Sequence, residues 1–309
     1  MIKYSIIIPT YNRAGLLKQG LEAVAAQTVP RYMYEVIVIN DGSRDYTNRV
    51  AEEFQKNHPE INFTYLKQKN HGVSHARNQG IKRAKGEIIF FTDDDCVVPE
   101  NWIETLANGY RRHPEVAGAG GWYEYPEDTR KNRFIQYTSY LFRRTYGREK
   151  EPLEMKSSTY LDNPAGNTSN MSYRKFVLDK VGGFDETINF VGLVDWELKK
   201  RVSDLGYPLL YIPYYVLHLK PLGIKEIIRK FFNRGRGKYH LVKKNPDLYP
   251  VFFPRFGWTL HMFLTVPREL KWMSLEDFLF TRLGWEYQKI EELLANFRHK
   301  RLEFRRVIH

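Results

Sequence analysis

The sequence has little cysteine and no long apolar run, and each shortage excludes a class of protein. Cys96 is the only cysteine in the 309 residues, which excludes an intrachain disulfide framework and is typical of a reducing compartment. The longest apolar stretch, residues 256–266, is about half of the roughly 18–20 residues that a membrane-spanning helix needs. A strand pattern begins at Tyr4, so we expect no secretory signal and a cytoplasmic protein.

Two phosphate-binding motifs are also missing. The sequence contains no GxGxxG and no GxxxxGK followed by serine or threonine. Oxidoreductases with a dinucleotide-binding fold and phosphotransferases with a P-loop are therefore disfavoured. Internal repeats and low-complexity tracts are missing as well, which argues against repeat architectures.

The composition is that of an ordinary globular protein with an uneven charge. Hydrophobic residues make up 42% and charged residues 27%, and the aromatic share of 15% fits both a packed core and platforms for stacked rings. The net charge is +12, and residues 221–309 hold +9 of it, with 18 Lys and Arg against 9 Asp and Glu. This segment predicts either an anionic partner, such as lipid head groups, nucleic acid or an acidic substrate, or a solubilising surface.

Apolar runs and helical spacings alternate along the first third of the chain. Runs rich in β-branched and aromatic residues predict strands at 4–9, 35–40, 63–67 and 87–92. Helical spacing lies between them, at 16–24, 50–54 and 74–84. This alternation predicts an α/β fold with a mostly parallel, doubly wound sheet that is flanked by helices.

The rest of the chain is less periodic. Further strands are predicted at 116–125 and 209–217 and a helix at 194–205, whereas 126–165 is typical of a long excursion or lid. After His218 the sequence becomes helical, basic and aromatic. We therefore predict a boundary near Pro221, between a catalytic domain of residues 1–220 and a basic helical region of residues 221–309.

Three consecutive aspartates, Asp93, Asp94 and Asp95, directly follow the predicted strand 87–92. Carboxylates this close repel one another unless they share a cation. Hard divalent cations take oxygen ligands and often bridge a carboxylate to substrate phosphates, and open α/β sheets bind ligands outside the carboxyl ends of their strands. The triplet predicts a site for a metal and a diphosphate, although a solvated turn before the next helix fits the same residues.

Polar residues also follow the first two predicted strands. Pro9, Thr10, Tyr11 and Arg13 end the first, and Asp41 follows the second, so all should share a sheet edge with the aspartates. Tyr11 is suited to stack on a base, Asp41 to accept hydrogen bonds from a base or ribose, and Arg13 to offset phosphate charge. An ordinary turn that caps a helix also fits the segment around Asp41.

Two charged residues near helix starts are further candidates. Arg77 lies one turn into the third helix, where it is placed to reach a diphosphate; pairing with the aspartates is its alternative. Asp195 begins the helix 194–205, where the helix dipole favours an ionised carboxylate. That suits a general base that takes a proton from a hydroxyl, and helix capping is the alternative.

The remaining candidates belong to the acceptor side and the metal shell. Asn167, Asn170 and Trp196 are predicted to line a hydroxyl-rich acceptor, although residues 166–170 also fit a plain polar turn. His218 is predicted to complete the metal shell, with a structural histidine as the alternative.

These segments together resemble a family 2 glycosyltransferase with the GT-A fold, over about residues 1–240. The resemblance is carried by Ser5-Ile-Ile-Ile-Pro-Thr-Tyr-Asn-Arg13, Asn40-Asp-Gly-Ser43, Ala76-Arg-Asn78, Asp93-Asp-Asp95, Gly166-Asn-Thr-Ser-Asn170, Gly182-Gly-Phe-Asp185 and Asp195-Trp-Glu-Leu198. Each segment alone is unspecific, and the set in this order is specific to the family.

The resemblance implies a nucleotide-diphospho-sugar donor, with a UDP-sugar favoured, a divalent metal (Mg²⁺ or Mn²⁺) and inversion at the anomeric carbon. It assigns the base and ribose to Pro9, Thr10, Tyr11 and Asp41, and it sets Asp93 and Asp94 against the nucleotide. Asp95 would ligate the metal, His218 matches a histidine that does so in some members, and Asp195 matches the general base.

The chain also departs from the family pattern. Val194 precedes Asp195 where many members have a glutamate, and the Gln-x-x-Arg-Trp sequence of processive synthases is missing. We therefore expect transfer of a single sugar to a glycan or a lipid-linked saccharide. The basic, aromatic composition of residues 221–309 predicts binding to an anionic membrane surface at the inner face of the cell membrane, and we expect no nucleic acid as partner. The alternatives are a polyprenyl-phosphate sugar transferase and a catalytically silent binding module.

Overall fold

The computed structural model describes residues 1–129, 132–137, 153–155, 165, 167–188, 193–219, 223–246 and 271–308. The chain divides into two compact units. The first comprises Met1–Asn189 and Val194–Pro221, and the second comprises Phe190–Leu193 and Leu222–His309. Most of the predicted lid 126–165 lies outside the described residues, and so does the predicted boundary residue Pro221.

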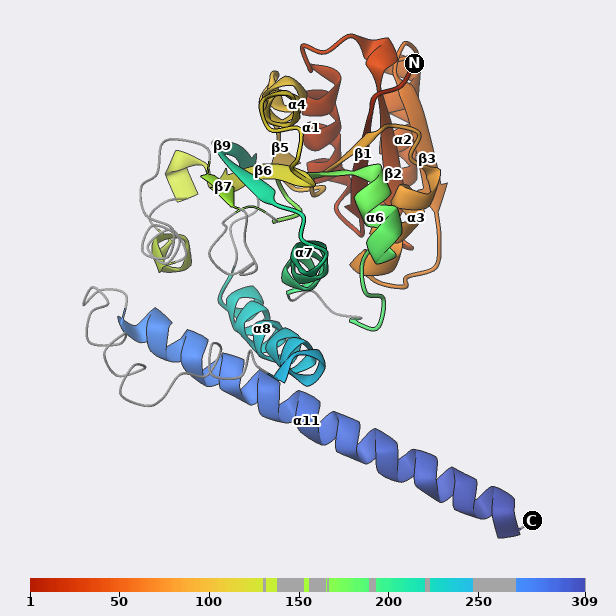
Figure 1. Ribbon diagram of the computed structural model, residues 1–309, viewed down its shortest axis with the longest axis vertical. Helices are drawn as coiled ribbons and strands as arrows, with labels where there is room; N and C mark the ends of the chain where they lie inside the picture. The colour runs from red at the N-terminus through yellow and green to blue at the C-terminus, as the bar shows by residue number, and fades with distance from the viewer. Residues whose placement is uncertain are drawn as a thin grey trace. The chain divides into compact units, whose positions relative to one another are not determined.

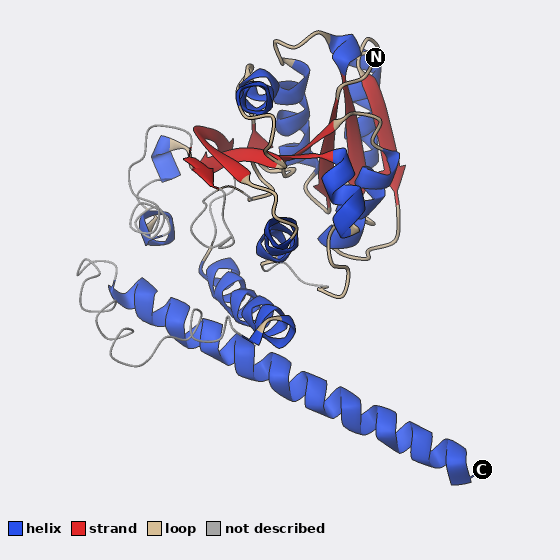
Figure 2. Cartoon of the chain, in the orientation of Figure 1, coloured by secondary structure: helices blue, strands red, loops and turns tan. Residues whose placement is uncertain are grey.

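The first unit is built on one mixed sheet, which Figure 2 shows in red among the helices. Its order is β3-β2-β1-β4-β8-β6-β9-β5, and β7 pairs with β9. The strands are β1 (Tyr4–Thr10), β2 (Tyr34–Asn40), β3 (Asn62–Lys67), β4 (Ile88–Phe91), β5 (Cys96–Val97), β6 (Gly118–Glu124), β7 (Leu153–Met155), β8 (Met171–Arg174) and β9 (Leu209–His218). The predicted α/β class is confirmed, and helices flank the sheet.

The parallel half of the sheet contains the point where the strand order reverses. β1, β2 and β3 follow one another outward, whereas β4 returns to the other side of β1 and is also parallel to it. β1 continues to Thr10, beyond its last pairing of Ile7 with Phe91 of β4. The residues after β1 and β4 therefore share one edge of the sheet, which is the usual place for a ligand in such folds.

Helices cover both faces of this half because its strands are apolar on both sides. Ile6 and Ile8 of β1 belong to a buried cluster with residues of α1 (Ala14–Ala25) and α2 (Thr47–Asn57). Ile7 points the other way, toward α3 (Val73–Arg83), as the alternation of a strand requires. Gly80 allows this close packing, since a Cβ there would overlap the Ile7 side chain.

The other half of the sheet is mixed. β8 is antiparallel to β4 and β6, while β6 and β9 are parallel. β5 is antiparallel to β9, with Cys96 opposite His218, and this pairing brings His218 to the aspartate turn. The helices of this half are α4 (Trp102–Arg112), α6 (Lys175–Val181) and α7 (Val194–Asp204).

The second unit contains two long helices, α8 (Ile224–Lys244) and α11 (Lys271–Ile308), which lie side by side in Figure 1. Gly235 and Gly284 let them approach closely, because a Cβ on either would overlap a backbone carbonyl of the other helix. Arg234 pairs with Asp277 at 2.7 Å beside this contact. Among the described residues, no helix is both long and apolar enough to cross a bilayer.

Candidate active site

The three aspartates form a tight turn between β4 and β5. The turn is closed by a hydrogen bond of 3.2 Å from the Cys96 amide to the Asp93 carbonyl. The side chains of Asp94 and Asp95 are only 5% exposed, and that of Asp93 is 25% exposed. His218 Nε2 lies 3.5 Å from Asp95 Oδ1. Three carboxylates and an imidazole therefore meet at the edge where β1 and β4 end.

Arg13 bridges two of these carboxylates. Its Nη1 donates to Asp94 Oδ1 at 2.9 Å and to Asp95 Oδ2 at 2.8 Å, and Thr10 Oγ1 donates to Asp94 Oδ2 at 2.8 Å. Burial raises the pKa of Asp94 to about 6, although the Arg13 charge opposes this, and the Asp95 charge adds to it. Burial alone would lower the pKa of Arg13, but the charges of Asp94 and Asp95 outweigh it and raise that pKa.

Arg77 occupies a similar place between the other two acidic groups. Its Nη2 donates to Asp93 Oδ1 at 2.9 Å, and its Nη1 lies 3.7 Å from Asp195 Oδ1. Ser169 Oγ donates to the other Asp93 oxygen at 2.7 Å. Although burial favours the neutral acid, the Arg77 charge and this hydrogen bond hold the pKa of Asp93 below its ordinary value.

Asp195 lies on the first turn of α7 and is held by one residue of the neighbouring turn. Thr168 Oγ1 donates to its Oδ1 at 2.9 Å, and the Thr168 amide donates to its Oδ2 at 3.3 Å. Burial raises the pKa of Asp195, which the Arg77 charge opposes and the Asp93 charge reinforces. The result is a carboxylate of increased basicity on a fixed support.

The position of Arg77 follows from how α3 is tied to the turn after α6. Asn78 donates to the Phe184 carbonyl at 2.9 Å and accepts from the Phe184 amide at 2.8 Å. Gly183 adopts a φ of +72°, and a Cβ there would overlap the Asn78 side chain. The Arg77 guanidinium lies over the Phe184 ring, 5.3 Å from its centroid. Arg77 is therefore buried and paired with Asp93 and Asp195. This pairing was the alternative to the predicted contact of Arg77 with a diphosphate.

The Asp41 carboxylate accepts most of its hydrogen bonds from the loop before α3. It is 5% exposed and accepts from Gln68 Nε2 at 2.7 Å and from the amides of His71 and Gly72, both at 2.9 Å. A carboxylate offers about four acceptor positions, so about one remains for a ligand. Tyr11 is 46% exposed at the same edge, directly after the buried Pro9 and Thr10.

The prediction that Asn170 lines an acceptor is wrong. Its side chain is fully buried, and it accepts from Trp102 Nε1 at 2.8 Å. Its Nδ2 donates to the carbonyls of Trp122 at 2.8 Å and Tyr214 at 2.9 Å. These bonds hold α4, β6 and β9 together, and the burial of the side chain leaves it inaccessible to a substrate.

The neighbouring turn makes two contacts with the carboxylates of the candidate site, and sequence reasoning missed both. Asn167 Oδ1 accepts from the Ser169 amide at 3.0 Å, and this turn directs Thr168 and Ser169 to Asp195 and Asp93. The sequence predicts that the side-chain amides of Asn167 and Asn170 line an acceptor, whereas the structure shows that the hydroxyls of Thr168 and Ser169 contact the carboxylates. Trp196 is half-buried beside Asp195.

The donor set at the turn fits a hard divalent cation. Among the described residues, ligand atoms of Asp93, Asp95 and Cys96 lie within 4.8 Å of one another. Burial and the charges of Asp93 and Asp95 raise the pKa of the Cys96 thiol well above its usual value, so it stays protonated and is a poor ligand. Carboxylate oxygens, the ligands that Mg²⁺ and Mn²⁺ prefer, are left.

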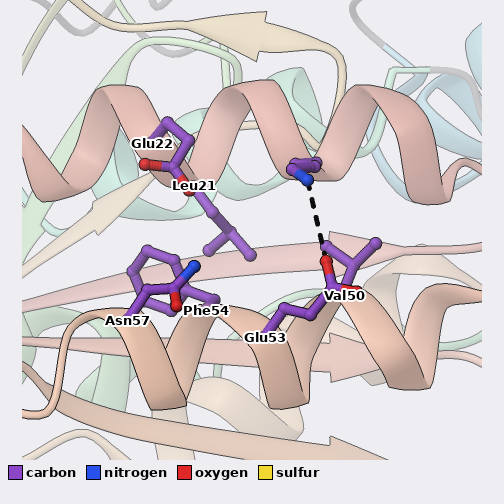
Figure 3. Close-up of a pocket in the computed structure, with 7 residues that line it drawn as sticks. Leu21, Glu22, Val50, Glu53, Phe54 and Asn57 are labelled. Carbon is purple, nitrogen blue, oxygen red and sulfur yellow. Dashed lines mark ion pairs between the residues drawn. The ribbon is translucent and has the colours of Figure 1, made fainter.

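A shallow hollow lies elsewhere, between α1 and α2 (Figure 3). Leu21, Val50 and Phe54 form its floor, and Lys18 and Glu53 close one side at 3.6 Å. Its lining includes none of the predicted site residues, and it offers no group of chemical interest beyond surface charges.

Comparison with known proteins identifies the family. The family model described as Glycosyl transferase family 2 matches residues 5–182. The glycosyltransferase AglE of Haloferax volcanii is 30% identical over 267 residues, which is 85% of this chain and 82% of AglE.

Two solved structures share the fold. A mannosyltransferase from Pyrobaculum calidifontis, in complex with GDP-Man and Mn²⁺, has a TM-score of 0.60 at 19% identity and covers 97% of this chain and 80% of its own. Residues 1–349 of Staphylococcus aureus TarS, in complex with UDP, have a TM-score of 0.57 at 16% identity, with 94% and 92% covered. The family model and AglE both align over more than half of the sequence, so the chain belongs to glycosyl transferase family 2 and is a glycosyltransferase.

Proposed function

We propose that the chain transfers one sugar, with inversion, from a nucleotide-diphospho-sugar to a hydroxyl of a glycan or lipid-linked saccharide. The observation that carries the proposal is the arrangement of Asp195 and Asp95 at one sheet edge, with Arg77 and Arg13 between the acidic groups. Direct displacement needs a base on the attacking hydroxyl and positive charge on the departing diphosphate, and this edge offers both.

Asp195 is the proposed base. The pKa that burial raises brings it nearer to neutral pH, where a base accepts a proton more effectively while it remains ionised. Thr168 holds both of its oxygens, so the carboxylate keeps one orientation toward the acceptor. Asn167 and Trp196 stand next to it and are the proposed acceptor contacts.

Asp95 is the proposed metal ligand, with Asp93 as a second carboxylate and His218 beside it. A bound Mg²⁺ or Mn²⁺ would neutralise charge on the leaving diphosphate. Arg13 is 39% exposed, so it has room to leave Asp95 and turn toward the phosphates. The Mn²⁺ in the mannosyltransferase complex supports a divalent ion here and leaves its identity open.

The nucleotide is proposed to lie along the ends of β1 and β2. Tyr11 would stack on the base, the remaining acceptor position of Asp41 would bind base or ribose, and Pro9, Thr10 and Asp94 would line the ribose side. Solved neighbours hold UDP or GDP-Man, so the fold accommodates either base. We favour a UDP-sugar.

Product analysis tests this function. Purified protein is incubated with Mn²⁺ and labelled UDP-sugars, each with a panel of saccharide, lipid-linked saccharide and polyprenyl-phosphate acceptors. Asp195→Asn should lower kcat about 10²–10⁴-fold and leave UDP affinity unchanged, since a general base contributes that much. The control is Asp204→Asn, at the far end of the same helix, where the side chain is 48% exposed and pairs with Lys200.

Three results would contradict the proposal. Full activity of Asp195→Asn would show that Asp195 is not the general base. A product that keeps the donor's anomeric configuration, as determined by NMR, would show that transfer does not invert. Transfer to polyprenyl phosphate alone would favour the rival acceptor. A silent binding module is disfavoured, because pure binding requires neither the aspartate turn nor Asp195.

A peripheral position at the cytoplasmic face of the membrane is part of the proposal for a lipid-linked acceptor. The net charge of +9 in residues 221–309 supports it. The support is reduced by the second unit's own packing, since Arg234 and Arg236 of α8 pair with acids of α11 and Trp285 is only 7% exposed. These side chains stabilise the helix pair and are poorly placed to bind lipid.

A further inference from the structure

The turn after α6 is hydrogen-bonded to two helices of the first unit. On the α3 side, Asn78 donates to the Phe184 carbonyl at 2.9 Å and accepts from the Phe184 amide at 2.8 Å. One oxygen of Glu186 accepts from Asn78 Nδ2 at 2.8 Å, and the other lies 2.8 Å from His75 Nδ1. His75 and Asn78 flank Arg77 in the sequence, so these bonds fix the part of α3 that carries this arginine.

Arg201 of α7 binds the end of α6 and the same turn. Its Nη1 donates to the Val181 carbonyl at 2.6 Å, and its Nη2 donates to the Gly183 carbonyl at 2.8 Å. Its Nε and Nη2 also donate to the two carboxylate oxygens of Glu197, at 2.7 and 2.6 Å. A bidentate pair of this kind holds the guanidinium plane in one orientation, and the two carbonyl bonds then join α7 to the turn.

The two helices that bind this turn carry two charges that face each other at the candidate site. Arg77 belongs to α3 and Asp195 to the first turn of α7, and Arg77 Nη1 lies 3.7 Å from Asp195 Oδ1. Thr168 orients the Asp195 carboxylate, but it belongs to neither helix. One short segment is therefore bonded to both helices, and Arg201 links that segment to the helix of Asp195.

We propose that Arg201 is a positioning residue, which holds α7 against the turn after α6 so that Asp195 keeps its place opposite Arg77. The proposal rests on the proposed function, in which Asp195 is the general base. Arg201 bonds to backbone carbonyls and to Glu197, none of which is a proposed ligand contact, so it acts on the reaction through Asp195. The planar fork of a guanidinium reaches two carbonyls and a carboxylate together, and the point charge of a lysine ammonium does not reproduce that geometry.

A double-mutant cycle tests this role. Arg201→Lys keeps a positive charge beside Glu197 and loses the fork, so kcat should fall about 10–100-fold with the donor KM unchanged, since a small misplacement of a catalytic group is that costly. In the Asp195→Asn background the same change should leave kcat as it is, because the group that Arg201 positions is already lost. The control is Lys175→Gln, which breaks the ion pair of 2.8 Å with Asp179, four residues away on α6, and should leave kcat unchanged in both backgrounds.

Fluorine NMR of the full chain labelled with fluorotryptophan measures the position of α7 without any measurement of activity. Trp196 follows Asp195 on the first turn of α7, and a Trp196→Phe sample assigns its resonance. Arg201→Lys should shift or broaden this resonance, and Lys175→Gln should leave it unchanged. Circular dichroism shows whether each variant is folded.

Three results would overturn the positioning role: a wild-type kcat in Arg201→Lys, an equal loss of kcat in both backgrounds, or an unchanged Trp196 resonance. Where Arg201→Lys does not fold, Glu197→Gln takes its place in the same cycle. It removes the charge that Arg201 binds and keeps the shape of the acceptor, so the same pattern with a smaller loss is expected. Failure of the proposed base is distinguished from these results, because it is measured as full activity of Asp195→Asn alone.

Discussion

At the scale of single residues, the site consists of four carboxylates bridged in pairs by two arginines. Arg13 joins Asp94 and Asp95, and Arg77 lies between Asp93 and Asp195. Without these cations, four carboxylates near one edge, two of them buried and two partly buried, would be strongly destabilising. The arginines therefore allow the acidic groups to lie close together.

The pKa of Asp94 predicts how stability depends on pH. Its folded value of about 6 lies above the ordinary 3.8, so the folded state binds this proton more tightly than the unfolded state. That contribution is complete below about pH 4 and is lost as pH rises through 6, at a cost of about 2–3 kcal/mol. Asp94→Asn keeps a group that can accept from Thr10 and removes the titration.

Chemical denaturation at pH 4.5 and pH 7.5 measures this effect. The difference in unfolding free energy between Asp94→Asn and wild type should move in favour of the variant by about 2 kcal/mol at the higher pH. Asp204→Asn, an exposed carboxylate, serves as control. An equal difference at both pH values would show that Asp94 has an ordinary pKa.

Prediction from sequence was most successful where a residue's role depends on its place after a parallel strand. Thr10, Arg13, Asp94 and Asp95 do meet at one edge, because strand alternation alone determines which ends converge. Asn170 was misplaced because its burial depends on β6, α4 and β9, which approach it only in the folded chain.

At the scale of elements, short strands were the features that periodicity could not predict. β5 has two residues and β8 has four, too few to show an alternation, yet β5 brings His218 to Asp95 and β8 follows the turn of Thr168 and Ser169. The long strands and α1 to α3 were predicted within a few residues, because their apolar positions repeat.

Substitutions in the turn after α6 test whether this turn positions Arg77 of α3. Gly182 and Gly183 both have positive φ, at 77° and 72°, so alanine is strained at either position. Only at Gly183 would the new Cβ also overlap Asn78, the neighbour of Arg77 in α3. We expect Gly182→Ala to cost about 1 kcal/mol of stability with kcat nearly unchanged.

Gly183→Ala should cost about 2–3 kcal/mol and lower kcat as well, because Asn78 must move and Arg77 moves with it. Thermal unfolding and steady-state kinetics of the two variants measure this. Equal effects of the two substitutions would mean that the Asn78 contact does not position Arg77.

At the scale of the whole molecule, the chain divides into a unit built on the sheet and a helical unit. The first contains the sheet edge and every proposed site residue. The second contains a helix pair joined by ion pairs and glycine contacts. The proposed site is therefore contained in the unit built on the sheet.

The central claim is that the aspartate turn binds a nucleotide diphosphate together with a divalent metal, and thermal unfolding measures it most directly. Wild type, Asp95→Asn and the control Asp204→Asn are heated with UDP, GDP, dTDP or CMP, in Mn²⁺ and again in EDTA. A nucleotide at about 100 times its dissociation constant adds roughly 2.7 kcal/mol, a few degrees for a chain of this size. The account predicts that shift for one nucleotide, UDP, only with Mn²⁺ and not in Asp95→Asn. No shift with any nucleotide, or a shift that survives both EDTA and Asp95→Asn, would contradict it.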